Sequence, residues 1–132
     1  MAERVLRRGA VYLIGSYTFP HEIATGGSAK ARPVIVLQDE LENRNPHYPF
    51  VIIAPLTSRK VDAIYPEDVL LPAGVANLPV PSKVLLGLIC AIEKTALTRW
   101  LGQVDDVHMT QVDAILQRLL GLSTAREQPA KR

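Results

Sequence analysis

Two apolar runs that have no polar face are the feature that most constrains the fold of this chain. Residues 34–37 (Val-Ile-Val-Leu) and 50–54 (Phe-Val-Ile-Ile-Ala) are apolar at every position. Short runs of this kind, bounded by turn-forming residues, are typical of strands buried inside a sheet. We therefore predict that residues 33–38 and 50–56 form strands, the first of them central.

Other short segments are rich in β-branched and apolar residues and lie between prolines, glycines and asparagines, a pattern that predicts further strands joined by loops. The predicted strands cover residues 10–14, 68–71, 84–92 (interrupted by Gly87) and 98–104, and the predicted loops or turns cover 15–30, 39–49 and 78–81.

After residue 104 the apolar residues change to a helical period. Spacings of three and four predict one core-facing helix face that contains Met109, Val112, Ile115, Leu116, Leu119 and Leu120. Asp105 is the predicted N-cap, Asp106 lies in the first turn, and Gly121 is the predicted C-cap. Short strands followed by one amphipathic helix predict a mostly β (α+β) domain, a small and partly open β-barrel with a C-terminal helix.

Composition narrows the class of protein. The 132 residues suit one domain, predicted over 1–122, and residues 123–132 form a predicted disordered basic tail. Residues 1–122 carry 12 basic and 12 acidic side chains, so the net charge of +2 lies on the tail, and the body is not a general polyanion binder.

No apolar run approaches the ~20 residues of a membrane span. Cys90, the single cysteine, predicts a reducing cytoplasm, and its apolar neighbours predict a buried small residue.

Two polar clusters adjoin the central strands. Arg32 precedes the predicted strand 33–38, and Thr57 and Ser58 follow the predicted strand 50–56. At the mouths of a barrel, these side chains are able to meet over one bound phosphate. The alternatives are that Arg32 pairs with an acid such as Glu22 or Asp39, and that the hydroxyls cap a turn. The three histidines are scattered without ligand spacing, so we expect no metal site.

The order of several short motifs over residues 7–122 resembles the MazF/PemK toxins. These motifs are Arg8-Gly9-x-Val11-Tyr12, Arg32-Pro33-Val34-x-Val36, Ala54-Pro55-x-Thr57-Ser58 and Ile92-Glu93-Lys94, followed by the C-terminal helix. The resemblance implies an SH3-like barrel, a cytoplasmic homodimer, and cleavage of single-stranded RNA without a metal or other cofactor. It also implies a cognate antitoxin that inserts an extended peptide along the RNA groove.

The resemblance assigns roles to particular residues. Arg32 matches the catalytic arginine of the family and Thr57 its catalytic threonine, acting while the RNA 2′-OH attacks the adjacent phosphate. Polar side chains beside these two positions are predicted to bind the substrate: Ser28, Lys30, Ser58 and Arg59. Because Ala29 stands where the family commonly has a loop glutamate, His21 and Glu22 are the candidate general bases.

A second departure leaves two functions open. Gly87 and Leu88 stand where the family usually carries an acidic residue and a glutamine on the strand before Lys94. The first hypothesis is a toxin endoribonuclease that cleaves single-stranded RNA. The alternative is a catalytically degenerate SH3-like module that binds RNA or an antitoxin-like peptide without cleaving it.

Overall fold

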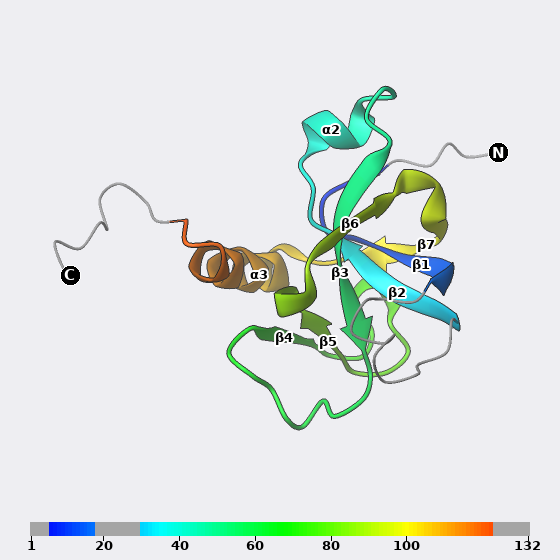
Figure 1. The fold of residues 1–132 in the computed structure, drawn as a ribbon. Coiled ribbons are helices and arrows are strands. Elements are labelled where there is room, and N and C mark those ends of the chain that lie inside the picture. Colours follow the sequence, from blue (N-terminus) through cyan, green and yellow to red (C-terminus); the bar gives the residue numbers. More distant parts are fainter. Residues whose placement is uncertain (1–5, 18–29, 123–132) are drawn as a thin grey trace, which may run out of the picture.

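A computed structural model describes residues 6–17 and 30–122, and within them the chain forms one curved antiparallel sheet with a long helix beside it (Figure 1). The strands are β1 (Ala10–Tyr17), β2 (Lys30–Val36), β3 (Phe50–Thr57), β4 (Asp68–Leu71), β5 (Ser82–Leu85), β6 (Cys90–Glu93) and β7 (Leu97–Gln103). The helices are α2 (Glu40–Arg44) and α3 (Asp106–Leu119), with single 3₁₀ turns η1 (Val75–Asn77), η2 (Leu86–Leu88) and η3 (Lys94–Ala96).

The sheet is ordered β4-β5-β3-β2-β1-β7, and β6 also pairs with β3. Its end strands β4 and β7 do not pair with each other, so the barrel is open, as predicted, and the mostly β fold with a C-terminal helix is confirmed. The three strands β1, β2 and β3 lie in the middle, and this central position explains why residues 34–36 of β2 and most of β3 are buried.

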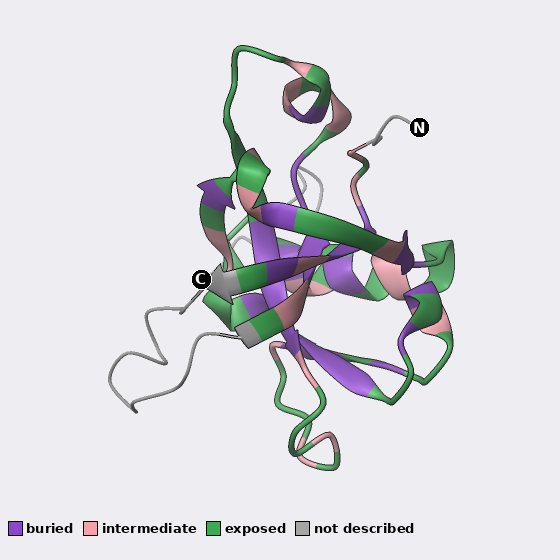
Figure 2. Ribbon diagram, turned by 90° about the vertical axis from the view of Figure 1, so that its right-hand side faces the viewer, coloured by how far each residue is buried: buried purple, intermediate pink, exposed green. Residues whose placement is uncertain are grey.

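Buried residues gather in the middle of the sheet, where the ribbon is purple in Figure 2, and apolar side chains cover both faces of the central strands. On β2, Ile35 packs in a first apolar layer that also contains residues of α3, whereas Val34 and Val36 pack in a second layer with side chains of β1, β3 and β7. Successive strand residues point to opposite faces. The apolar run 34–37 therefore serves two cores, which confirms that it lies in a central strand.

The predicted strand 84–92 is wrong as a single element, because the chain forms two strands there. The turn η2 separates β5 from β6, and both strands pair with the same edge of β3. β5 pairs with Leu56 and Thr57, and β6 pairs with residues 50–53. Gly87, which weakens a strand because it has no side chain to pack, lies inside the turn. The break lets β5 pair on its other edge with β4, at the end of β3 that carries Thr57.

The predicted turn 39–49 contains a short helix, α2, that the sequence pattern did not indicate. The side chain of Asp39 caps this helix, because its Oδ1 accepts a hydrogen bond from the Glu42 N–H at 3.1 Å. Five residues are too few to display a helical period. The loop prediction was therefore wrong over Glu40–Arg44.

The start of α3 is confirmed. Asp105 is its N-cap and also contacts the His108 ring, with 2.7 Å between Oδ1 and Nδ1. This hydrogen bond from His108 lowers the pKa of the Asp105 carboxyl. At the other end the C-cap is Leu120, and Gly121 follows it in the left-handed conformation (φ 71°), so the predicted C-cap was one residue too late.

Only part of the predicted helix face is core. Val112 and Leu116 are buried, with Met109 and Ile115 packed beside them, but Leu119 and Leu120 are 36% and 53% exposed. The last turn of α3 extends past the edge of the sheet (Figure 1), so its leucines have no layer to pack against in the described chain. None of the described helices is both long and apolar enough to cross a membrane.

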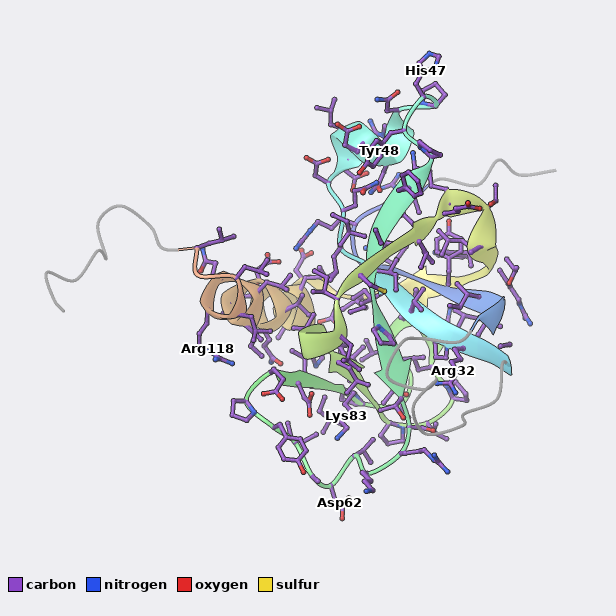
Figure 3. All side chains as sticks on the ribbon, in the orientation of Figure 1. Arg32, His47, Tyr48, Asp62, Lys83 and Arg118 are labelled. Atoms are coloured by element: carbon purple, nitrogen blue, oxygen red, sulfur yellow. The ribbon has the colours of Figure 1, made fainter. Side chains whose placement is uncertain are left out.

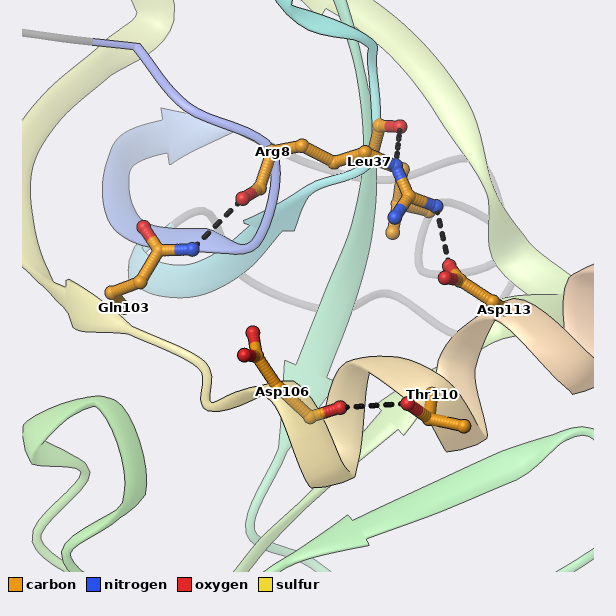
Figure 4. A network of polar contacts seen from close by, with 6 residues as sticks. All are labelled: Arg8, Leu37, Gln103, Asp106, Thr110 and Asp113. Carbon is orange, nitrogen blue, oxygen red and sulfur yellow. Dashed lines mark hydrogen bonds and ion pairs between the residues drawn. The ribbon is translucent and has the colours of Figure 1, made fainter.

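Arg8 joins α3 to the sheet (Figure 4). Its Nη2 lies 2.8 Å from Oδ1 of Asp113 on α3, and its Nε donates to the Leu37 carbonyl at 2.8 Å. The Gln103 side chain donates to the Arg8 carbonyl, and Thr110 donates to the carbonyl of Asp106 within the helix. The partly exposed ion pair contributes at most about 1 kcal/mol, so the network fixes the angle of the helix more than it stabilises the fold.

Gly102 on β7 is required by close packing. A Cβ at this position would lie 2.6 Å from the carbonyl carbon and oxygen of Ala76, whose backbone is held in the left-handed region (φ 51°). The neighbouring Asn77 side chain fixes this turn by donating to the Leu101 carbonyl at 2.7 Å. Because the added Cβ would meet backbone atoms, no flexible side chain is able to move aside and make room for it.

We therefore expect Gly102→Ala to lower the free energy of unfolding by about 1–3 kcal/mol, the usual range for overpacking. Urea denaturation checks this, with Gly15→Ala on β1 as the control, because among the described residues no atom outside its chain neighbours lies within 4 Å of a Cβ there. Equal denaturation midpoints for the two variants would show that the turn at Ala76 moves freely.

Candidate functional site

Arg32 lies inside β2 rather than before it. The strand begins at Lys30 because β1 continues to Tyr17, which pairs with Lys30, and Arg32 pairs with Ile14. The predicted boundary at residue 33 was therefore too late. Arg32 is half-buried and its Nε atom is buried, so packing holds the part of the guanidinium that lies nearest the backbone.

Thr57 is the last residue of β3, one residue beyond the predicted strand end, and it is half-buried. The β2–β3 ladder pairs Val34 with Pro55 and Ile35 with Ala54, and it ends there. Arg32 and Thr57 each lie two residues beyond the Val34–Pro55 pair, toward the same end of the two strands. The β2–β3 pairing thus places the predicted cation and hydroxyl at the same end of the sheet.

The hydroxyl of Thr57 has a turn role as well. Its Oγ1 accepts a hydrogen bond from the Arg59 N–H at 3.1 Å, as the turn alternative predicted. A hydroxyl has one donor hydrogen in addition to its acceptor lone pairs. The bond from Arg59 fixes the oxygen and leaves the hydrogen able to point toward a ligand beside Arg32.

The alternative pairing of Arg32 with Asp39 is wrong. Asp39 lies beyond the opposite end of β2, where it is exposed and caps α2. Glu22, the other acid considered for this pairing, lies outside the described residues, as do His21 and Ser28.

The predicted substrate-binding residues on the β3 side are accessible. Ser58 and Arg59 are exposed and follow Thr57 directly, and Lys60 comes next in a left-handed conformation (φ 54°). On the other side, Lys30 is the first residue of β2, two positions before Arg32. Cationic residues therefore adjoin both members of the Arg32–Thr57 pair in the chain.

The stretch that lacks the polar residues of the MazF/PemK pattern lies in and after the turn η2. Gly87 and Leu88 are exposed within this turn, and Cys90 at the start of β6 is half-buried rather than buried as predicted. Burial raises the pKa of the Cys90 thiol, which makes it a poor nucleophile at neutral pH. Among the described residues, no group of three His, Cys, Asp or Glu side chains is placed to hold a metal ion.

One residue beside the site was missed by the sequence analysis. Lys83 on β5 is the register partner of Thr57, and its ammonium is buried against the Asp68 carboxylate. Figure 3 shows Lys83 and Arg32 at the same end of the sheet. The sequence does not indicate that the lysine between Ser82 and Val84 is buried, because lysine is almost never buried unless it is paired.

Residues 7–120 match the family described as PemK-like, MazF-like toxin of type II toxin–antitoxin system. Endoribonuclease MazF6 of Mycobacterium tuberculosis is 39% identical over 94 residues, which are 71% of this chain and 82% of that protein. Endoribonuclease MazF of Staphylococcus saprophyticus is 31% identical over 126 residues, which are 96% of this chain and 100% of that protein.

Solved structures show the same fold at lower identity. The crystal structure of MazE–MazF (Form-II) from Deinococcus radiodurans has a TM-score of 0.70 at 24% identity, covering 92% of this chain and 100% of that one. A mycobacterial endoribonuclease in complex with its cognate antitoxin has a TM-score of 0.67 at 22% identity, covering 92% of this chain and 99% of that one. The structural likeness therefore covers nearly the whole chain.

Proposed function

The chain belongs to the PemK-like, MazF-like toxins of type II toxin–antitoxin systems, and we propose that it is an endoribonuclease that cleaves single-stranded RNA. Two relatives that are 39% and 31% identical are named endoribonucleases, and a protein of the same fold was solved with its cognate antitoxin. We infer accordingly that this chain acts as a cytoplasmic homodimer and that a cognate antitoxin inhibits it.

The observation that supports the proposal is the β2–β3 pairing, because Arg32 and Thr57 each lie two residues beyond its last pair, Val34–Pro55, at the same end of the sheet. In the proposed reaction the RNA 2′-oxygen bonds to the adjacent phosphorus, and the bond from phosphorus to the 5′-oxygen breaks. The leaving 5′-oxygen takes up a proton from the protonated general base or from water, so the products are a 2′,3′-cyclic phosphate and a 5′-OH end. Negative charge grows on the non-bridging oxygens, two of which a planar guanidinium is able to hold at once. The Thr57 hydroxyl donates to the same phosphate.

Proton transfer needs another group. A guanidinium has donor hydrogens and no acceptor lone pair, so Arg32 does not accept the proton of the 2′-OH. His21 and Glu22 remain the proposed general bases. The ordinary pKa of a histidine side chain lies near neutral pH, which suits a group that accepts a proton during the reaction. Ser28, Lys30, Ser58 and Arg59 are proposed to bind the flanking phosphates and bases of the RNA.

Digestion of single-stranded RNA in excess EDTA tests the proposal. We expect cleavage at an undiminished rate, with fragments that end in a 2′,3′-cyclic phosphate and begin with a 5′-OH, because the charge stabilisation comes from side chains rather than from a metal ion. A DNA strand of the same sequence should remain intact, since it lacks the 2′-OH. Intact RNA after long incubation, together with measurable RNA affinity, would instead favour the non-cleaving module.

A further inference from the structure

We propose that the buried Lys83–Asp68 ion pair is a positioning clamp for the β3–β4 loop (residues 58–67), and that it thereby sets how tightly and how selectively the site holds RNA. The inference rests on the proposed function, but it concerns two residues to which the catalytic proposal gives no role. Its basis is the set of contacts that these two side chains make with the loop.

Lys83 connects the loop to the strand that carries Thr57. Its backbone pairs with Thr57 in the β3–β5 register and with Leu70 of β4 on the other side. Its side chain is 6% exposed and its Nζ donates to the Ala63 carbonyl at 2.8 Å. A single residue therefore contacts the strand end at Thr57 and the middle of the loop that leaves it.

Asp68 holds the second half of the same loop. The carboxylate is 3% exposed, and its Oδ2 lies 3.5 Å from the Lys83 Nζ while accepting the Tyr65 N–H at 3.0 Å. The Asp68 N–H in turn donates to the Tyr65 carbonyl at 2.9 Å. The Lys83 ammonium also lies 5.4 Å from the centre of the Tyr65 ring, within the range of a cation–π contact. The loop is thus held at Ala63 and at Tyr65.

Stability alone does not explain this arrangement. Burying a lysine and a carboxylate carries a large desolvation penalty, and well-packed apolar residues often stabilise such a position as well or better. What an ion pair adds is direction, because an ammonium with two oxygen acceptors has a defined geometry that an apolar contact lacks. We infer that the pair is present to fix where the loop lies.

The position of the loop matters because its first residues adjoin the proposed reaction site. Ser58 and Arg59 are exposed, and the Arg59 N–H contacts the Thr57 hydroxyl oxygen. A loop that is free at Ala63 would let these side chains sample many directions, and ordering them again on each RNA molecule would weaken binding. The clamp should therefore act on binding rather than on the chemical step.

The chain offers a matched control at the other end of β3. Lys94 makes the same kinds of contact: its Nζ donates to the carbonyls of Glu42 at 2.7 Å and Asn45 at 3.0 Å, and it lies 5.9 Å from the Tyr48 ring centre. Figure 3 shows Tyr48 at the end of the molecule opposite Arg32 and Lys83. Lys94 therefore ties down a loop that is remote from the site.

The test compares Lys83→Met, Lys94→Met and the double variant Lys83→Met/Asp68→Asn with the wild type. We expect Lys83→Met to raise KM for a single-stranded RNA roughly tenfold with kcat changed less than twofold, and to widen the set of cleaved sequences in an RNA library. Hydrogen exchange at the Ala63 and Tyr65 amides should become at least roughly tenfold faster as the loop opens locally. Lys94→Met should leave KM and these two amides unchanged.

The double variant separates positioning from global stability. Removing both charges avoids an unpaired buried carboxylate, so we expect a higher unfolding midpoint than for Lys83→Met alone, while KM stays raised. If KM recovers together with stability, or if kcat falls while KM is unchanged, the clamp proposal is wrong. If the wild type cleaves no RNA, only the nuclease proposal is overturned. The clamp is then tested by the affinity for a 2′-deoxy oligonucleotide and by the hydrogen-exchange rates.

Discussion

Replacing Arg32 with alanine should lower kcat for RNA cleavage by about 10²–10³-fold or more, the usual effect of removing one donor to a developing oxyanion. Arg32 on β2 lies at the same end of the sheet as Thr57 on β3, and we propose that its guanidinium contacts the phosphate where charge develops. Because this charge exists in the transition state more than in the bound substrate, KM should change much less than kcat. Single-turnover cleavage of a labelled RNA measures the two effects separately.

Two further variants make the Arg32 result specific. Arg32→Lys keeps the positive charge but loses the planar two-point contact, so we expect at least roughly a tenfold loss of kcat. Arg99→Ala removes an exposed arginine from β7 and should leave kcat unchanged. Full activity in Arg32→Ala, with an unfolding midpoint near that of the wild type, would remove Arg32 from the mechanism.

The sequence predicted the fold wherever one residue pattern dominated. The apolar run 34–37 indicated a central strand, and the spacing of Val112 and Leu116 indicated a core-facing helix; the structure confirms both. The same reasoning failed at 84–92, because apolar residues continue through the turn at Gly87 and hide a change of strand partner. It failed again at Leu119 and Leu120, because the period of a helix does not reveal where its neighbouring sheet ends.

The residues of the candidate site were also predicted only in part. Arg32 and Thr57 were proposed because breaker residues adjoin them and the resemblance to a family gave them a chemistry, although Arg32 lies inside β2 rather than at its end. Their placement at the same end of the sheet depends on the β2–β3 register, which local sequence does not specify. Lys83 and Asp68 were missed because each appears as an ordinary surface charge in the sequence, and only the β4–β5 pairing buries them together.

In the proposed site, strands carry the residues for the chemical step and a loop carries residues that bind the RNA. The two proposed catalytic side chains lie on strands in the middle of the sheet, where packing fixes the backbone on both faces. The proposed binding residues Ser58 and Arg59 lie in a loop held by side-chain contacts. Sites on rigid elements are more precise than sites on loops, and loops tolerate change more readily. Sequence preference should therefore change by substitution in residues 58–67 without loss of the chemical step.

Thr57 gives the second large expected effect. Thr57→Val has nearly the same shape but lacks the hydroxyl, so it removes the donor to the phosphate and the acceptor for the Arg59 N–H. We expect kcat to fall by about 10²-fold, as for the loss of one oxyanion donor. The exposed turn bond contributes only about 0.5–1.5 kcal/mol to stability, so the protein should stay folded at assay temperature. Rapid-mix cleavage and urea denaturation of the same preparation measure both quantities.

Thr57→Ser and Thr110→Val decide what a loss of activity in Thr57→Val means. The serine variant keeps the hydroxyl at the same strand end and should retain kcat within about tenfold of the wild type, whereas a threonine needed only for packing would not be rescued by serine. Thr110→Val removes a hydroxyl that donates within α3 to the Asp106 carbonyl, and it should leave cleavage unchanged. Equal kcat values for Thr57→Val and the wild type would reduce Thr57 to a turn residue and leave Arg32 as the sole proposed donor to the phosphate.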